Sequence, residues 1–401
     1  MSSQLTGKSS AKVDSPARPY TSAFTRLPSW LDGLRFIVIL FVTTRTLLTV
    51  IGVYSRQFLE PFHGQHYYWV YSRHLWLDIW GVWDTGWFLE IAQSGYSTAL
   101  SADPIKLNQA NYCFFPLYPL LMRLFAPHYY VGGLLIANFC LMAGSLLLYR
   151  LVLLESNRET ALRSVKYFYL MPAGFVLSAG FSESLFVALA LACFYFARRP
   201  EPKWWLVGLS GFFLCLTRPN GIIALFPLGF EYLRHCHFQF RRIRSNVLWL
   251  MLLPAGIGAY SAYCHRLTGD WLAYVHVRAT GWKHAYQNPF NLIIDNLFSR
   301  GPEDQVNAVF TVILIGVIVW AWRRFPFAYW SWAALNLAVL LVNGQAVMNS
   351  MFRYAIVIFP LAILLGGLCE NRRRDELMSV GLALIQAFLM VFWANGFHVI
   401  V

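Results

Sequence analysis

The 401-residue sequence is poor in charged side chains. Asp, Glu, Lys and Arg together make up 13% of it, and 58% is hydrophobic. Soluble domains carry about 25% charged residues, so this composition excludes an ordinary soluble enzyme. We expect an all-α polytopic membrane protein, whose length divides into helices and loops rather than into soluble domains.

Several familiar site signatures are also missing. The seven cysteines are scattered, mostly in apolar runs, and no CxxC pair occurs, which excludes a disulfide framework and a zinc site. His63 and His66 form the only close pair among the histidines of the long loops, and their spacing fits no metal site. The sequence therefore predicts no metal and no cofactor. It also has no Walker loop and no GxGxxG, so a nucleotide-sugar donor bound in the cytosol is not expected.

The N-terminal segment differs from the rest of the chain. The first 30 residues are rich in Ser, Lys, Arg and Pro and lack an apolar h-region, so no cleavable signal peptide is predicted. We expect residues 1–33 to be a disordered cytosolic tail. Residues 34–401 are then a single transmembrane domain.

About eleven apolar runs are predicted to be membrane spans. Several are shorter than the ~20 residues of a full crossing, so some must be tilted, broken or only part-way in. No internal repeat is evident. The runs are 34–53, 129–154, 164–180, 182–197, 203–217, 220–236, 246–266, 304–322, 327–344, 352–370 and 377–397.

Lys and Arg predict the orientation. If the chain crosses eleven times from a cytosolic N-terminus, every short basic loop falls on one side, which the positive-inside rule makes cytoplasmic. The net charge of +13 then indicates contact with anionic lipid rather than with nucleic acid. The basic groups lie in the N-terminal tail and near 155–166, 198–203, 234–244, 323–324 and 372–374.

The extracytoplasmic side receives two long loops, 54–113 and 267–303. The first is rich in Trp and Tyr and is predicted to fold as helices on the outer leaflet. The other polar interruptions of the apolar chain fall on this side as well. Five separate segments therefore converge on one membrane face, and polar clusters that persist near a bilayer are candidates for function.

Asp84 is the candidate general base. Trp83, Trp87 and Ile91 recur at i, i+4 and i+8, which indicates an amphipathic helix with its apolar stripe toward the membrane. Asp84 lies at the start of this helix, and a carboxylate near apolar groups can take a proton from a hydroxyl acceptor. The alternative is that Asp84 caps the helix N-terminus, which Asp does very often.

Arg218 and Arg353 are the candidate phosphate ligands. Both are predicted at outward-facing helix N-termini, where a cation opposes the helix dipole, and on the side that Lys and Arg tend to avoid. A bound anion would resolve both conflicts, since helix N-termini and Arg side chains suit phosphate. The alternatives are an Arg that snorkels to headgroups or one that pairs with a carboxylate such as Glu183.

Other polar residues on this face have supporting roles. Glu183 follows a Ser at the outer start of a span, where it either completes a helix N-terminus or accepts hydrogen bonds from sugar hydroxyls or an Arg. Asn220 and Tyr354 adjoin the two arginines. Arg278 and Lys283 in the second long loop could also contact phosphate; the alternative is that they have no role, as is common for Lys and Arg in loops.

Such a site fits a lipid-linked phosphosugar reached from within the bilayer. The rival class is a transporter or flippase. A transporter would show polar residues at mid-membrane on several helices, or paired broken helices in two repeats. Here the polar residues lie at one face and no repeat is seen.

The motifs of this face, in order, resemble the PIG-V type GPI mannosyltransferase II family and its prokaryotic relatives. The similarity runs over most of the chain, from 83 to 354. It is carried by Trp83-Asp84…Phe88…Ile91-Ala92…Gly95-Tyr96, the run 114–119 (FFPLYP), the run 178–186 (SAGFSESLF), the run 217–221 (TRPNG) and Ser350…Arg353-Tyr354.

The resemblance implies a GT-C glycosyltransferase fold whose first outer loop carries the catalytic Asp, which Asp84 matches. It implies inverting transfer of mannose from a polyprenyl- or dolichyl-phosphate donor to a hydroxyl on a glycolipid or glycan acceptor. The length favours a prokaryotic relative in the plasma membrane, where the acceptor need not be a GPI precursor. A GT-C enzyme that uses another lipid-phosphate sugar is the second alternative.

Overall fold

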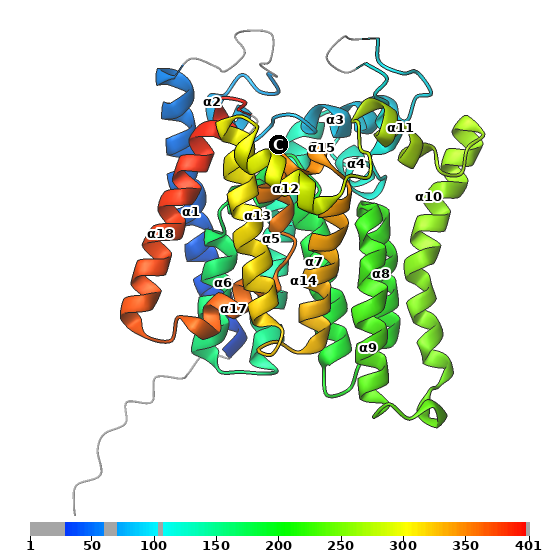
Figure 1. The fold of residues 1–401 in the computed structure, drawn as a ribbon, viewed down its shortest axis with the longest axis vertical. Helices are drawn as coiled ribbons and strands as arrows, with labels where there is room; N and C mark the ends of the chain where they lie inside the picture. Colours follow the sequence, from blue (N-terminus) through cyan, green and yellow to red (C-terminus); the bar gives the residue numbers. More distant parts are fainter. Residues whose placement is uncertain (1–28, 60–69, 103–106, 398–401) are drawn as a thin grey trace, which may run out of the picture.

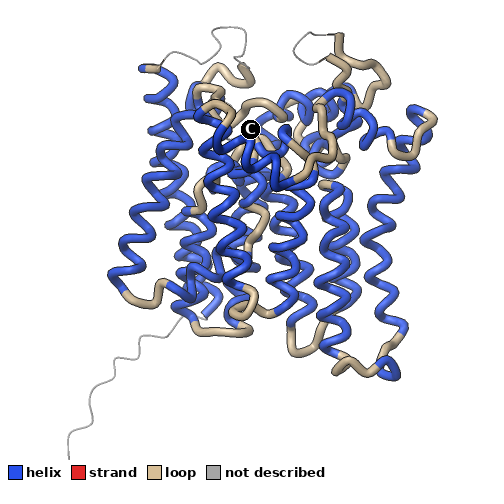
Figure 2. The backbone as a smooth tube through the Cα atoms, in the orientation of Figure 1, coloured by secondary structure: helices blue, strands red, loops and turns tan. Residues whose placement is uncertain are grey.

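The computed structural model describes residues 29–59, 70–102 and 107–397, and every regular element in these ranges is a helix (Figures 1 and 2). The all-α prediction is therefore confirmed for the described chain. Most of the predicted disordered tail, residues 1–28, lies outside these ranges, as does part of the first long loop.

Five of the described helices are long and apolar enough to cross a membrane, judged by length and composition alone. The helices α8 (Trp204–Thr217) and α14 (Phe327–Val342) are apolar but shorter. The count of eleven spans therefore stays a prediction. The five are α1 (Ser29–Phe58), α5 (Tyr129–Leu153), α10 (Leu252–Thr268) with the preceding η6 (Ser245–Met251), α13 (Pro302–Ala321) and α18 (Arg372–Ala394).

The bundle is an upright array in which α1 and α18 stand at one edge and α10 at the other (Figure 1). Between them pack the shorter helices, with a core of large side chains such as Tyr149, Phe194 and Trp332, all fully buried. These helices are α6 (Arg158–Leu170), α7 (Glu183–Arg198), α8, α9 (Leu225–His235), α14 and α17 (Pro360–Leu368).

Short helices gather at one end of the bundle (the upper end in Figure 1) and form a lid-like layer over it. Most come from the two long loops predicted from the sequence, so the expectation of a helical first loop is confirmed. They are α2 (Leu75–Asp78), α3 (Thr85–Ser94), η2 (Asn111–Cys113), α4 (Leu117–Arg123), α11 (Ala273–Gly281), α12 (Pro289–Phe298), α15 (Gln345–Met348) and α16 (Met351–Ala355).

The basic short loops lie at the opposite end. Figure 1 shows the α5–α6, α7–α8, α9–η6 and α13–α14 connections and the start of α18 at the lower end of the bundle. The groups of Lys and Arg recognised in the sequence at these positions therefore share one end, away from the layer of short helices.

Two predicted spans are broken rather than continuous. In the run 164–180, α6 ends at Leu170 and the chain continues through Pro172 into a short 3₁₀ segment, η3 (Gly174–Ser178). In the run 352–370, α16 ends at Ala355 and α17 begins at Pro360. Proline removes a backbone donor and clashes with the preceding turn, which ends a helix.

The first break is stabilised by side chains from distant helices. Lipid offers no hydrogen bonds, so the freed carbonyl groups need donors from the protein. Gln386 Nε2 on α18 donates to the carbonyl oxygens of Tyr169 (2.8 Å) and Met171 (2.9 Å), and Arg45 Nη2 on α1 donates to that of Gly174 (3.3 Å). The irregular segment is thus held in one conformation inside the bundle.

The last described helix also holds the first loop. Trp393 Nε1 donates to the Ile79 carbonyl oxygen at 2.9 Å, and Arg56 Nε donates to the carbonyl oxygen of Ala394 at 2.8 Å. The Arg56 guanidinium also pairs with the buried carboxylate of Asp78, which accepts the backbone N–H of Tyr71 at 2.7 Å. The start of the loop that leads to Asp84 is therefore anchored on both α1 and α18.

Candidate active site

Asp84 occupies the N-cap position of α3, but its side chain makes no capping hydrogen bond. Arg353 Nη2 instead donates to Asp84 Oδ2 at 2.6 Å. The preceding Trp83 has a φ of 47°, a left-handed conformation that is strained for a residue with a Cβ. Asp84 therefore stands at the start of the helix as predicted. The alternative that its carboxylate caps the helix is wrong, because the carboxylate contacts Arg353 instead.

Glu183 is the buried centre of the site. It is the first residue of α7 and is fully buried, and its Oε1 accepts hydrogen bonds from Arg353 Nε and, at 2.8 Å, from Arg218 Nη2. Arg218 Nε also donates to Ser182 Oγ at 3.2 Å. Four segments that are far apart in the sequence are therefore joined in one polar chain, Asp84–Arg353–Glu183–Arg218.

Arg353 and Arg218 differ in how far their guanidinium groups are already occupied by protein partners. Arg353 touches both carboxylates, its side chain is 3% exposed, and its guanidinium carbon lies 4.3 Å from the ring centroid of Phe181. The Arg218 side chain is 17% exposed and shares one carboxylate with Arg353. Arg218 is therefore the more available of the two for an incoming anion.

A small pocket of about 60 Å³ opens beside Arg218. A second guanidinium, that of the half-buried Arg278 on α11, lines it as well. Two cations at one pocket suit an anionic group such as phosphate. The pocket is lined by Arg218, Pro219, Asn220, Arg278, His284, Leu340, Asn343, Val347 and Tyr354.

His284 contributes an uncharged imidazole to this pocket. Burial, and then the positive charge of Arg278, lower the pKa of His284 to about 4. The ring is therefore neutral at neutral pH, and its Nδ1 is buried without a hydrogen-bond partner among the described residues. A neutral ring can offer a ligand either a donor or an acceptor.

Besides Arg278 and Lys283, seven residues were singled out from the sequence, and all seven lie at the same end of the bundle. The structure joins Asp84, Glu183, Arg218 and Arg353 and places Asn220 and Tyr354 at the adjoining pocket. The seventh, Trp83, precedes Asp84 and packs on the hydrophobic cluster beneath the loop. His284 was not selected from the sequence, because nothing distinguishes a lone loop histidine from a solvated one.

A model of the Mannosyltransferase (PIG-V) family matches residues 66–265. This chain belongs to the PIG-V type mannosyltransferase family. The matched segment contains three members of the polar chain, Asp84, Glu183 and Arg218, whereas Arg353 and Arg278 lie beyond it. The resemblance inferred from the ordered motifs is confirmed.

Two known proteins are similar to this PIG-V family member. GPI alpha-1,6-mannosyltransferase 2 of Mus musculus is 30% identical over 161 residues, which cover 36% of this chain and 29% of the mouse protein. ArnT from Cupriavidus metallidurans, solved bound to undecaprenyl phosphate, superposes with a TM-score of 0.52 at 13% identity, covering 87% of this chain and 63% of ArnT. The second likeness shows the fold, so the GT-C architecture expected from the resemblance is confirmed.

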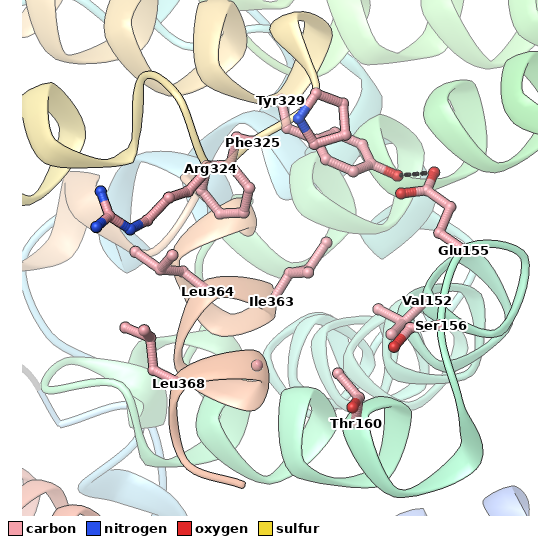
Figure 3. A pocket seen from close by; sticks show the side chains of 12 residues that line it. Val152, Glu155, Ser156, Thr160, Arg324, Phe325, Tyr329, Ile363, Leu364 and Leu368 are labelled. Atoms are coloured by element: carbon pink, nitrogen blue, oxygen red, sulfur yellow. Dashed lines mark hydrogen bonds between the residues drawn. The ribbon is translucent and has the colours of Figure 1, made fainter.

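This PIG-V family chain has a second pocket, of about 260 Å³, between the ends of α5, α6, α14 and α17 (Figure 3). Its carboxylate, Glu155, accepts a hydrogen bond from the Tyr329 hydroxyl at 2.8 Å and pairs with Arg198. Ile363 and Leu364 supply an apolar wall (Figure 3). This pocket lies at the end of the bundle that carries the basic loops, away from Asp84 and the pocket beside Arg218, and is therefore the poorer candidate.

Gly180, in the segment just before α7, allows the start of α3 to lie close to that segment. A Cβ added there would lie 2.9 Å from Thr85 Cγ2, and Thr85 is fully buried next to Asp84. We expect Gly180→Ala to lower stability by about 1–3 kcal/mol through overpacking and to reduce turnover by displacing Asp84. Thermal unfolding and specific activity of the purified protein measure both effects.

Gly229→Ala is the matched control, because a Cβ at Gly229 meets no atom within 4 Å. It should leave both quantities close to those of the wild type. Normal turnover of Gly180→Ala would show that the position of Asp84 does not depend on this close contact.

Proposed function

We propose that this chain is an integral-membrane mannosyltransferase that moves mannose from a polyprenyl-phosphate donor, dolichyl-phosphate-like in chemistry, to a hydroxyl of a glycolipid or glycan. Membership of the PIG-V type family supports the sugar, and the GT-C fold supports an enzyme that works at the membrane. The undecaprenyl phosphate bound by the structurally similar ArnT supports a lipid-phosphate donor.

In this proposal Asp84 is the general base. Its carboxylate is 21% exposed, so it can reach an acceptor, and Arg353 holds it in place. The acceptor oxygen attacks the anomeric carbon while its proton passes to Asp84. The bond from that carbon to the donor phosphate oxygen breaks, and the phosphate leaves with the electron pair. A single displacement of this kind inverts the configuration at the anomeric carbon.

Arg218 and Arg278 hold the leaving phosphate. Both line the same pocket, and Arg278 lies within electrostatic range of Asp84 and Tyr354. Fixed cations that meet charge developing on the phosphate lower the barrier. Arg353, proposed from the sequence as a second phosphate ligand, is already engaged by Asp84 and Glu183. We therefore assign it to positioning the base.

The observation that carries the proposal is the continuity of the polar chain with the two-arginine pocket. It supports the proposal because Asp84, Arg218 and Arg278 lie at the same end of the helix bundle. That end lies opposite the basic loops, so the positive-inside rule makes it extracytoplasmic. A prokaryotic plasma membrane is the location proposed. A donor with a prenyl chain would enter from the bilayer, between helices.

Two alternatives differ in their products. A GT-C enzyme of another lipid-phosphate sugar would use the same residues with a different donor. A transporter or flippase would move a lipid or sugar and form no glycosidic bond.

The test is a donor panel with the full chain reconstituted in liposomes. It compares labelled polyprenyl-phosphate mannose, polyprenyl-phosphate glucose and GDP-mannose, with glycolipid and glycan acceptors. Labelled product from the mannolipid alone is expected. Product from the glucose lipid alone would reassign the sugar. Transfer from GDP-mannose without a lipid donor, or lipid movement without any glycoside, would overturn the proposal.

Arg278→Gln tests whether Arg278 binds the phosphate of the donor. A lost hydrogen bond to a charged group is worth about 1.5–3 kcal/mol, so we expect the donor KM to rise by roughly 10- to 100-fold. Arg266→Gln on α10 is the control, because this exposed residue does not line the pocket. Steady-state kinetics over a range of donor concentrations measures the effect. An unchanged donor KM would remove Arg278 from the phosphate site.

A further inference from the structure

The opposite end of the bundle holds a larger and strongly basic pocket of about 520 Å³. It is formed where α9 ends and the chain turns through η5 (Phe240–Arg242) toward η6. Figure 1 shows this turn at the lower end, away from the layer of short helices that carries Asp84. The pocket is lined by Trp204, Tyr232, His235, Cys236, Arg241, Arg242, Arg244 and Asn246.

The three arginines that line this pocket carry uncompensated charge. Arg241, Arg242 and Arg244 are exposed, and none of them forms an ion pair or side-chain hydrogen bond with another described residue. The neighbouring buried carboxylate, that of Glu231, is occupied by Arg198 and Arg234. Arg218 and Arg353 of the candidate active site are paired with acids, whereas these three arginines have no counter-ion among the described residues.

The loop that presents the arginines is held in one shape. The Tyr232 hydroxyl donates to Asn246 Oδ1 at 2.6 Å and accepts the backbone N–H of Arg244 at 3.1 Å. His237 and Phe238 both have positive φ, 54° and 56°, in a conformation that is unfavourable for residues with a Cβ. Backbone strain of this kind persists where the surroundings enforce it, and it clusters at binding and switch regions.

Large apolar side chains are interleaved with the basic ones. Phe238 and Phe240 in the loop are 55% and 79% exposed, and Leu248 and Trp249 in η6 are 65% and 45% exposed. Arginines beside exposed aromatic and aliphatic groups are typical of a segment that lies in the headgroup region of a bilayer. A soluble anionic partner would leave these apolar groups in water.

We propose that this pocket binds the phosphate headgroup of an anionic phospholipid in the leaflet opposite the candidate active site. Arg241, Arg242 and Arg244 contact the phosphate oxygens, and the exposed Phe238 and Phe240 lie against the acyl chains. Basic pockets between helices at a membrane surface suit such headgroups. The inference does not depend on the proposed reaction, because the two sites lie at opposite ends of the bundle.

Lipid binding by the full-length chain tests this directly. The protein is purified in a neutral detergent, titrated with phosphatidylglycerol or with phosphatidylcholine, and the retained lipid is counted by native mass spectrometry. We expect preferential retention of phosphatidylglycerol, and a fall of roughly tenfold to a hundredfold in its affinity for R241Q/R242Q/R244Q. Phe238→Ser with Phe240→Ser should weaken binding as well, while leaving the charge intact.

R372Q/R373Q/R374Q is the matched control. It removes the same charge from exposed positions at the start of α18, at the same end of the bundle but outside the pocket. It should bind phosphatidylglycerol as the wild type does. Thermal unfolding of every variant checks that each remains folded.

Three results would overturn the proposal. Equal losses in both triple variants would show a general effect of charge. Equal retention of phosphatidylcholine would show that the headgroup is not recognised. Displacement of the lipid by millimolar inorganic phosphate, together with normal binding by the Phe238/Phe240 variant, would indicate a site for free phosphate instead.

Discussion

Asp84→Asn should lower the transfer rate by about 10²–10⁴ while donor affinity stays nearly unchanged. Loss of a general base typically has an effect of this size. An Asn side chain keeps an oxygen that can accept from Arg353 Nη2, so the polar chain and the pocket beside Arg218 should persist. Turnover and equilibrium binding of the polyprenyl-phosphate donor are measured separately in reconstituted membranes.

Glu90→Gln provides a matched control for this experiment. Glu90 is an exposed carboxylate on the same helix, α3, and it accepts a hydrogen bond from Asn111 Nδ2 at 2.9 Å, which Gln can retain. Its turnover should remain close to that of the wild type. A normal rate for Asp84→Asn would remove Asp84 from the reaction, whereas a parallel loss of donor binding would make it a binding residue.

The second large effect is expected from Glu183→Gln. Its fully buried carboxylate compensates two guanidinium groups, those of Arg218 and Arg353. Neutralising it leaves two cations close together without their shared acid. Removing one partner of a buried ion pair typically costs about 3–5 kcal/mol. We expect a lower unfolding temperature and, in the molecules that still fold, loss of transfer because Arg353 no longer holds Asp84.

Glu231→Gln is a control that separates the loss of stability from the loss of transfer activity. Glu231 is 1% exposed and also lies between two arginines, Arg198 and Arg234, but at the end of the bundle opposite Asp84. Its replacement should lower the unfolding temperature in a similar way. Its activity per folded molecule should stay near that of the wild type. If Glu183→Gln also kept normal activity per folded molecule, the carboxylate would be purely structural.

The sequence was sufficient to place the candidate residues on one face. The low content of charged residues, the apolar runs and the basic loops on one side all follow from the free-energy cost of placing polar groups in lipid. This cost acts on each residue separately, so its effect can be recognised in the sequence. Which arginine pairs with which carboxylate depends instead on the fold. The sequence offered Glu183 only as one alternative partner for an arginine. Both arginines share it, although Arg353 lies 170 positions away. The partners are selected by the fold, which brings α16 and the start of η4 (Pro219–Ala224) to the first residue of α7.

The broken helices show the same limit. Pro172 lies just beyond the end of α6, and Pro360 is the first residue of α17, so neither interrupts a helix from within and both mark a boundary that the sequence can indicate. The donors that satisfy the freed carbonyls, Gln386 and Arg45, come from α18 and α1, and no local pattern indicates them. Arg278 could be considered for phosphate from its residue type. Its place beside Arg218 depends on how α11 lies over the bundle.

The contacts between α18 and the first loop bear on how the protein is made. Ribosomes deliver helices in order, and the loop that leads to Asp84 is synthesised long before Trp393, Ala394 and the rest of α18. Until those residues emerge, the Ile79 carbonyl and Arg56 lack these contacts. A chain that ends before α18 would therefore lack these anchors of the first loop, and we expect that loop to be cleaved by proteases more readily than in the full chain.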